Sequence, residues 1–170
     1  MVTFPHTIRP ARPDDALRLQ AIELAADQLF AAIGYATLPP ESVEALNAYV
    51  NSGRSWVAVA DGEVVGYILV GVVDGAAHIF QVTVHPDFQG QGFGKALVEQ
   101  AKTWARSTGR QALTLATYQE VPWNRPLYEH LGFRIFDDSE FGPEMRAGQE
   151  HDAAKGLGPG GRVAMRLDID

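Results

Sequence analysis

The sequence from Val82 to Lys95 reads VTVHPDFQGQGFGK and joins the end of a predicted strand to the start of a predicted helix. Gly90, Gly92 and Gly94 alternate in the turn between them. Glycines allow successive backbone N–H groups to converge on an anion without obstruction by Cβ, and a helix N-terminus adds partial positive charge. The stretch therefore predicts a pyrophosphate-binding turn. The alternative is a helix start whose glycines serve tight packing alone.

Two common phosphate-binding motifs do not fit this turn. The P-loop requires Gly where Gln89 stands and Ser or Thr where Ala96 stands. The dinucleotide fingerprint requires Gly or Ala where Lys95 or Leu97 stands. A mononucleotide P-loop and a dinucleotide-binding fold are therefore both disfavoured.

Hydrophobic periodicity on both sides of the turn predicts an α/β fold. Helices are expected from the capping residues Asp14 and Asp15 to near Gly34, and over residues 41–49, 92–107 and 126–131. Strands are expected over residues 8–11, 56–60, 64–73, 77–84, 113–116, 133–136 and 163–169. The order βααβββαβαββ predicts a mixed, mostly antiparallel central sheet with helices on its faces.

The sequence predicts one domain over residues 1–170, with a long loop over residues 137–161. That segment is Gly-rich, acidic and weakly patterned. It is too long for an ordinary connection between antiparallel strands, so two interpretations stand. One is an acidic lid with hinges at Gly142, Gly148 and Gly156, and the other is a solvated excursion without a function.

Composition excludes several classes of function. The chain of 170 residues has no Cys, which excludes disulfides, thiol nucleophiles and Cys metal sites. Its formal net charge of −7 disfavours nucleic acid and favours a cationic or amine-bearing substrate. The five His form no metal-ligand spacing, so no metal is expected. Without a signal peptide or a membrane-spanning run, a cytoplasmic protein is expected; the oligomeric state, a homodimer included, stays open.

Two motifs carry a resemblance to a known family. Residues 89–94, QGQGFG, resemble the Gln/Arg-x-x-Gly-x-Gly/Ala signature of the GNAT superfamily of N-acetyltransferases. Residues 128–133, YEHLGF, resemble the Tyr-x-x-x-Gly-Phe segment that follows the fifth strand in that family. The predicted order of strands and helices also matches the family fold along nearly the whole chain.

The resemblance implies acetyl-CoA as co-substrate and assigns residues to it. The main chain of the Val82-Thr83-Val84 strand end would pair with the pantetheine arm. The N–H groups of the turn would hold the pyrophosphate; its residues are Gln89, Gly90, Gln91, Gly92, Phe93, Gly94 and Lys95. Tyr128 matches the tyrosine that protonates the departing thiolate, the alternative being a core tyrosine that packs a short helix.

The family position of the general base falls on His78, six residues before the strand-ending Val84. A histidine titrates in a useful range, but a lone histidine at a strand start is often only structural. Many relatives carry Glu where this chain has Gln81, which cannot act as a base.

Three further side chains leave alternatives open. Asn124 stands closer to Tyr128 than the usual family asparagine does, and it either binds the pantetheine arm or caps the helix that follows, with the cap favoured. Glu23 and Asp27 lie four residues apart on the first helix, where they would meet a cationic substrate or, as most such pairs do, face water.

The predicted function is direct acetyl transfer from acetyl-CoA to a primary amine of a small molecule or a peptide, without a covalent intermediate. The alternative is a non-catalytic acyl-CoA-binding sensor of the same fold. The resemblance implies that the 137–161 segment and the segment joining the first two helices border the acceptor cleft. Because the latter carries Phe30, Ile33 and Tyr35, a partly apolar acceptor pocket is expected.

Overall fold

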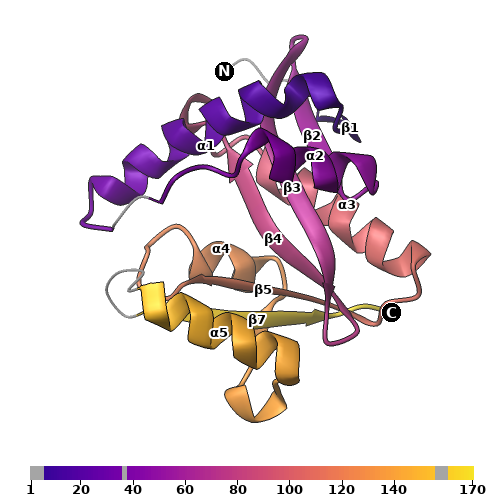
Figure 1. Cartoon of the computed structure of the whole chain (residues 1–170), viewed down its shortest axis with the longest axis vertical. Coiled ribbons are helices and arrows are strands. Elements are labelled where there is room, and N and C mark those ends of the chain that lie inside the picture. Colours follow the sequence, from indigo (N-terminus) through magenta and orange to yellow (C-terminus); the bar gives the residue numbers. More distant parts are fainter. Residues whose placement is uncertain (1–5, 36–37, 156–160) are drawn as a thin grey trace. The chain divides into compact units, whose positions relative to one another are not determined.

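The computed structural model describes residues 6–35, 38–155 and 161–170 (Figure 1). Its strands are β1 (Thr7–Pro10), β2 (Ser55–Ala60), β3 (Glu63–Val73), β4 (Ala76–Val84), β5 (Ala112–Tyr118), β6 (Arg134–Ile135) and β7 (Arg162–Asp168). Its α-helices are α1 (Ala16–Ala31), α2 (Val43–Asn51), α3 (Phe93–Ser107), α4 (Arg125–His130) and α5 (Pro143–Lys155). Short 3-10 helices are η1 (Pro13–Asp15), η2 (Pro86–Phe88) and η3 (Asp138–Glu140).

The strands of the described residues form one sheet in the order β1-β2-β3-β4-β5-β7-β6. The pairs β1–β2, β2–β3, β5–β7 and β6–β7 are antiparallel, whereas β4 and β5 run parallel. The predicted mixed, mostly antiparallel sheet flanked by helices is thereby confirmed. No described helix is both long enough and apolar enough to cross a bilayer.

The chain divides into two compact units. Unit 1 comprises Met1–Val70 and Phe80–Ala101, and unit 2 comprises Gly71–Ile79 and Lys102–Asp170. The prediction that the whole chain is one domain stays a prediction.

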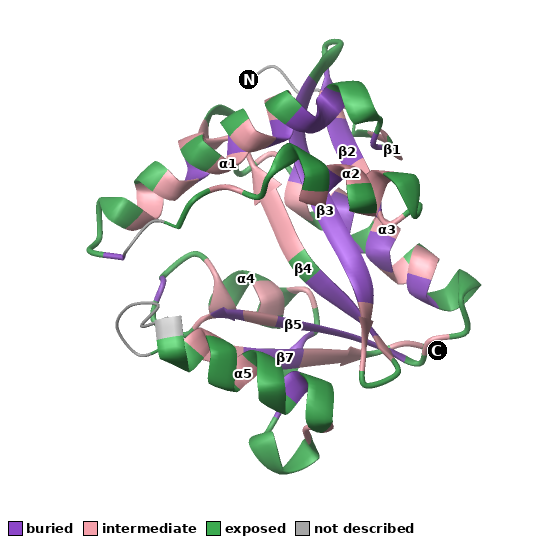
Figure 2. Cartoon of the chain, in the orientation of Figure 1, coloured by how far each residue is buried: buried purple, intermediate pink, exposed green. Residues whose placement is uncertain are grey.

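In unit 1, α1 and α2 pack against one face of β2 and β3. Leu19 and Ile22 of α1, Leu46 of α2 and Tyr67 of β3 are all fully buried in this core. Each buried aliphatic side chain contributes about 1.5–3 kcal/mol relative to exposure. β3 is buried over most of its length (Figure 2). It lies between β2 and β4 inside the sheet, and the helices that pack on the sheet cover its side chains.

Gly66 on β3 lies where the opposite face of the sheet meets α3. A Cβ at this position would come within 2.9 Å of the Thr83 carbonyl oxygen, 3.3 Å of Val84 Cγ2 and 3.4 Å of Leu97 Cδ1. Only glycine therefore allows β3, the end of β4 and the start of α3 to approach this closely.

Two helix starts differ from the sequence prediction. Asp15 occupies the N-cap position of α1, but its side chain makes no capping bond there. It accepts two bonds from the Arg9 guanidinium, at 2.8 and 3.0 Å, and one from the Arg12 N–H. The second helix starts at Val43 because the Ser42 hydroxyl accepts the Ala45 N–H at 3.1 Å.

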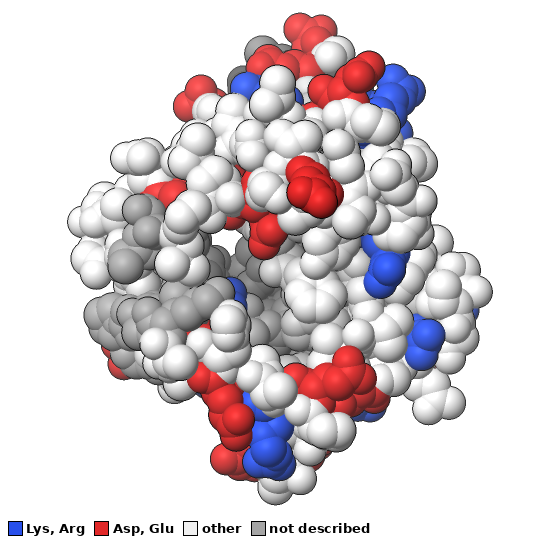
Figure 3. Space-filling view, in the orientation of Figure 1, with Lys and Arg blue, Asp and Glu red and all other residues white. Residues whose placement is uncertain are grey.

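Unit 2 shows that the predicted long loop over residues 137–161 is wrong. Most of this segment is ordered as η3 and α5. Met145 of α5 is buried with Phe136 and Ala164, and Val73 and Phe141 pack against them. The rest of α5 is mostly exposed (Figure 2), and acidic side chains gather over it and the turn before it (Figure 3). Met145 is the one buried residue among those of α5 whose burial is described, so this helix offers little hydrophobic periodicity to detect. The hinge proposed at Gly156 lies outside the described residues.

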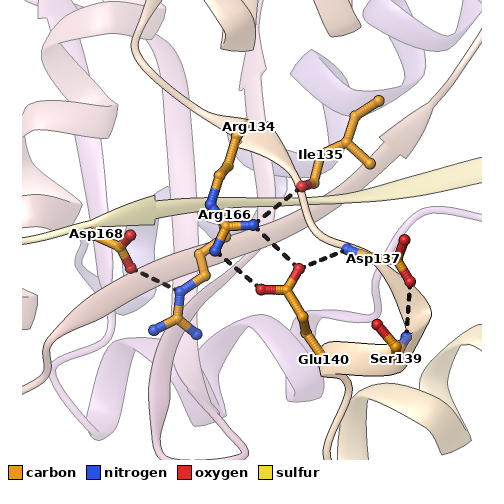
Figure 4. A network of polar contacts seen from close by, with 7 residues as sticks. All are labelled: Arg134, Ile135, Asp137, Ser139, Glu140, Arg166 and Asp168. Carbon is orange, nitrogen blue, oxygen red and sulfur yellow. Dashed lines mark hydrogen bonds and ion pairs between the residues drawn. The ribbon is translucent and has the colours of Figure 1, made fainter.

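The turn between β6 and α5 is held by a local network (Figure 4). Arg134 forms two bonds of 3.1 Å with the Glu140 carboxylate. The same carboxylate accepts the Asp137 N–H at 3.0 Å, and the Asp137 side chain accepts the Ser139 N–H at 2.9 Å. This reciprocal capping fixes η3, so residues 137–140 are a structured turn.

The start of α5 is capped from the β3–β4 hairpin. The two Asp74 carboxylate oxygens accept the N–H groups of Glu144 and Met145, each at 2.9 Å, and the Asp74 N–H donates to Glu144 Oε1 at 3.2 Å. Gly142 is needed beside this cap, since a Cβ there would come within 2.4 Å of the Asp74 Cγ. The Asp-Gly turn therefore both closes a hairpin and caps a helix distant in sequence.

Replacing Asp74 with Ala should lower the free energy of unfolding by about 1 kcal/mol more than replacing Asp61 with Ala. Both residues have positive φ in Asp-Gly hairpins, at 50° and 49°, so both changes carry the same backbone strain. Only Asp74 caps a helix. Denaturant unfolding of the two variants measures the difference, and equal losses would show that the cap contributes nothing.

Candidate active site

The glycine-rich turn of unit 1 connects the end of β4, through η2, to α3. Gly90 and Gly92 have φ values of 76° and 87°, which side chains with a Cβ rarely adopt. The His85 ring accepts the Asp87 N–H at 3.1 Å, and the Gln89 side chain donates to the Val84 carbonyl at 3.2 Å. The turn is thus tied to the strand on its N-terminal side.

The head of α3 presents backbone donors at this turn. The first intrahelical bond runs from the Ala96 N–H to the Gly92 carbonyl at 3.0 Å, so the N–H groups of residues 93–95 precede the helical ladder. Phe93 is buried and anchors the helix start, while Lys95 is exposed. Around Gly90, a Cβ would meet nothing within 4 Å. Open space, backbone donors and the helix dipole together suit a pyrophosphate.

His6 reaches this turn from the start of the described chain, and no sequence motif indicates this contact. Its Nε2 lies at hydrogen-bonding distance from the Gln91 carbonyl, and its ring packs edge-on against Phe93 with centroids 4.9 Å apart. A Cβ at Gly92 would come within 2.7 Å of the His6 ring. Substitutions at Gly92 therefore disturb His6 as well as the turn.

The predicted pantetheine-binding segment, Val82-Thr83-Val84, is half-buried at the end of β4. The parallel ladder between β4 and β5 pairs residues 77–79 with residues 113–115, and the segment follows these residues along β4. Gln81, the residue before it, donates to the Thr83 hydroxyl at 3.1 Å.

A carboxylate of α1 contacts the same part of unit 1. Glu23 Oε2 lies 3.4 Å from the Tyr67 hydroxyl and accepts the Glu41 N–H at 3.2 Å. Burial raises the pKa of Glu23, and hydrogen bonds from Gln81, Glu41 and Tyr67 oppose this. Burial and the neighbouring Glu23 charge raise the pKa of Asp27 to about 6. The pair is therefore not an ordinary solvated helix face, the interpretation that its sequence spacing favoured.

His78, the predicted base, is buried in unit 2. Its Nδ1 lies 2.7 Å from the Thr114 hydroxyl oxygen, and that hydroxyl donates to the Ala77 carbonyl at 3.4 Å. This pattern favours the tautomer protonated on Nδ1. Burial lowers the pKa of His78 to about 4; Arg162 acts in the same direction and Asp152 opposes it. The ring is therefore neutral at pH 7 but a weak base.

Tyr128 lies on α4 of unit 2, with its ring edge-on to Phe133 at 5.9 Å. Burial raises its pKa to about 12, and the positive charge of Arg162 opposes the shift. Arg162 itself pairs with Asp152 at 3.1 Å and lies over the Tyr118 ring at 5.4 Å. Arg162 thus acts electrostatically on both predicted catalytic residues, and sequence reasoning missed it because it stands in an ordinary alternating strand.

Asn124 stands at the N-cap position of α4, yet its side chain makes no capping bond. The favoured capping role is therefore wrong, and a role in cofactor binding stays a prediction. Val121, at the position of the usual family asparagine, is buried. No group of three His, Cys, Asp or Glu able to hold a metal ion occurs within the described ranges.

Comparisons with known proteins agree with these features. The family model described as "Acetyltransferase (GNAT) family" matches residues 20–133. An uncharacterized N-acetyltransferase of Bacillus subtilis, YvbK, is 28% identical over 120 residues, which cover 70% of this chain and 76% of the relative. The peptidyl-lysine N-acetyltransferase YjaB of Salmonella typhimurium is 32% identical over 101 residues, which cover 59% of this chain and 63% of the relative.

Solved structures share the fold. The PaiA N-acetyltransferase of Thermoplasma acidophilum, crystallised with coenzyme A, superposes with a TM-score of 0.76 at 16% sequence identity. The superposition covers 97% of this chain and 99% of the other. At this identity the likeness supports the fold alone.

Replacing Gly94 with Glu should abolish the rise in Tm that acetyl-CoA produces by mass action. The carboxylate would stand in the first turn of α3, where it favours the helix but repels a pyrophosphate. Gly94→Ala is the matched control, because its Cβ meets only Val84 Cγ2 at an ordinary 3.8 Å. The control should keep the shift. A full shift in Gly94→Glu would place the cofactor elsewhere.

The burial of neutral His78 predicts a pH dependence of stability. The unfolded chain takes up a proton near the ordinary pKa of 6.5, while the folded ring does so only near 4. The unfolded state therefore binds more protons between these values, and stability falls as pH falls through that window, by roughly 3 kcal/mol in total.

His78→Asn removes this titration and keeps a hydrogen-bonding group near Thr114. Unfolding free energies measured at pH 7 and pH 4 should differ less for the variant than for the wild-type protein. Because other groups titrate equally in both, identical losses would mean that His78 is not buried in its neutral form.

Proposed function

Because the chain belongs to the acetyltransferase (GNAT) family, we propose that it transfers an acetyl group from acetyl-CoA directly to a primary amine of a small molecule or a peptide. The observation that carries this proposal is the turn at Gly90 and Gly92, which leaves the first donors of α3 next to the end of β4. The chain has no Cys to form a thioester intermediate, which is consistent with direct transfer.

Unit 1 supplies the binding groups for the co-substrate. Backbone N–H groups of the Gln89–Lys95 turn hold the pyrophosphate, and the main chain of Val82 and Val84 pairs with the pantetheine arm. Acetyl-CoA, when bound, supplies an activated thioester, and the protein's residues orient it and manage the protons.

Tyr128 is the proposed donor to the leaving sulfur. With a pKa of about 12 its hydroxyl keeps its proton at neutral pH. Since an ordinary thiol has a pKa of about 8.5, complete proton transfer from so weak an acid to the thiolate is unfavourable. The hydroxyl therefore stabilises the developing thiolate chiefly by donating a hydrogen bond, and Arg162 favours any negative charge that builds on the phenol oxygen.

The lowered pKa of His78 makes it an inefficient general base. A group with a pKa of about 4 holds only a weak affinity for a proton taken from an ammonium. Its bond to Thr114 ties β4 to β5 within unit 2. The assignment of His78 as the base stays a prediction that this burial disfavours.

The proposal predicts release of free thiol when the protein is incubated with acetyl-CoA and a panel of primary amines. The panel should include a lysine peptide, because the Salmonella relative is named as a peptidyl-lysine enzyme. A non-catalytic acyl-CoA sensor would bind acetyl-CoA, as judged by Tm, and release no thiol with any amine.

Tyr128→Phe should lower kcat by about 10- to 1,000-fold with acetyl-CoA affinity unaltered, since only the donor is lost. Tyr118→Phe is the control, because it removes a hydroxyl from another tyrosine beside Arg162 and keeps the ring that Arg162 covers. If the two variants turn over equally fast, Tyr128 is a packing residue.

A further inference from the structure

Glu23 differs from an ordinary surface carboxylate in its burial and in its hydrogen bonds. Its side chain is half-buried, and its Oε2 is bonded by the Tyr67 hydroxyl at 3.4 Å and the Glu41 N–H at 3.2 Å. Burial is the largest influence on its pKa and raises it from the ordinary 4.5. Neither Glu23 nor Asp27 forms an ion pair within the described part of the chain. The carboxylate is thus held in place without being neutralised.

Tyr67 fixes the orientation of this carboxylate. The tyrosine is fully buried, and burial together with the negative charges of Glu23 and Asp27 raises the pKa of its phenol far above the ordinary value. The Tyr67 hydroxyl therefore keeps its proton and donates a hydrogen bond to the Glu23 carboxylate. The Thr83 side chain opposes this shift in the pKa of the same phenol, so one buried ring interacts with both α1 and β4.

Gln81 provides a second link to β4. Its side chain donates to the Thr83 hydroxyl at 3.1 Å, and its donor group also lowers the pKa of Glu23. Gln81 and Thr83 flank Val82, whose main chain is proposed to pair with the pantetheine arm. One side chain therefore separates the Glu23 carboxylate from the strand end that would hold the thioester arm, entirely within unit 1.

An open hollow of about 280 Å³ lies one helical turn further along α1. It is lined by Leu24, Asp27, Gln28, Leu38, Pro39 and Pro40. Leu24 and Leu38 are exposed although apolar, and Asp27 is the only charged residue among the described residues of the lining. Such a surface suits a primary amine that carries an apolar body, with its ammonium attracted to the two carboxylates.

We propose that Glu23 is the general base of the acetyl transfer and accepts a proton from the ammonium group of the acceptor. The apolar body of this acceptor lies against the hollow beside Leu24 and Leu38. This inference rests on the proposed acetyltransferase function. The reaction converts R–NH3+ and the thioester into the acetamide, free thiol and one proton. Glu23 takes the first proton from nitrogen, the nitrogen lone pair attacks the thioester carbonyl, the C–S bond breaks, and the second nitrogen proton goes to sulfur.

The titratable groups around Glu23 carry negative charge or, like Tyr67, stay neutral; the charge of Glu41 raises the pKa of Glu23, while the hydrogen bond from Tyr67 lowers it. They are Asp27 on the same helix, Glu41 before α2 and Tyr67 on β3, while β4 contributes the neutral Gln81 and Thr83. A base whose pKa is moved from 4.5 toward neutrality is better matched to an amine than His78, whose pKa moves away from it.

Glu23→Gln tests the assignment, because the amide keeps the size and can still accept from Tyr67. We expect kcat/KM for the amine to fall by about 100- to 10,000-fold, with the acetyl-CoA shift in Tm unchanged. Glu120→Gln, at an exposed residue of unit 2, makes the same change in net charge and should retain activity. Equal activity in the two variants would overturn the base assignment.

A titration of the wild-type protein provides a second measurement that needs no turnover. The 13C signal of the Glu23 carboxyl should titrate above pH 4.5, and Asp27→Asn should move its midpoint to lower pH by removing the adjacent negative charge. A midpoint at or below 4.5 would contradict the proposal. Failure of the wild-type protein to acetylate any amine would overturn the proposed function itself, whereas undiminished transfer by Glu23→Gln would overturn this inference alone.

Discussion

The close approach of β3 to β4 and α3 at Gly66 is the constraint on which unit 1 depends. The Thr83 carbonyl lies where a Cβ would come within 2.9 Å, so any side chain at Gly66 would push the end of β4 and the head of α3 away. Those two segments frame the glycine-rich turn. The next residue along β3, Tyr67, points to the opposite face, where its hydroxyl holds Glu23. Two consecutive residues of one buried strand therefore position the proposed cofactor turn and the proposed base.

Burial shifts the pKa values of ionisable residues in both units. It keeps the phenols of Tyr67 and Tyr128 protonated and the His78 ring neutral, and it raises the pKa of Glu23. The turn itself relies on backbone dipoles, which act at short range. The proposed binding of a polyanion at this turn is therefore compatible with a net charge of −7, and the same net charge would attract the proposed amine.

The sequence predicted the elements whose patterns are local and failed where a tertiary contact decides. The strands, α3 and the glycine turn follow from periodicity and from residues needing positive φ. Helix α5 was missed because it buries mainly Met145 and takes its cap from Asp74, a residue of a distant hairpin. Its one local signal, Pro143 followed by Glu144 at a helix start, could have found it.

The sequence likewise predicted only those residues of the candidate site that belong to local motifs. The turn residues and Tyr128 belong to recognisable motifs. Glu23 does not, since its distinction from a solvated helix residue lies in contacts with Tyr67 and Gln81, which come from other strands. Asn124 carried the sequence signature of a cap, yet its side chain makes no capping bond. Spacing along the chain cannot report such contacts, because they depend on how strands and helices pack.

Amide chemical shifts followed during a titration with acetyl-CoA test the central claim most directly. The claim is that backbone N–H groups at the head of α3 bind the pyrophosphate. In 1H–15N correlation spectra the largest changes should appear at the amides of residues 92–95, with smaller ones at Val82 and Val84. Saturable binding that leaves the amides of residues 92–95 unmoved would contradict the account.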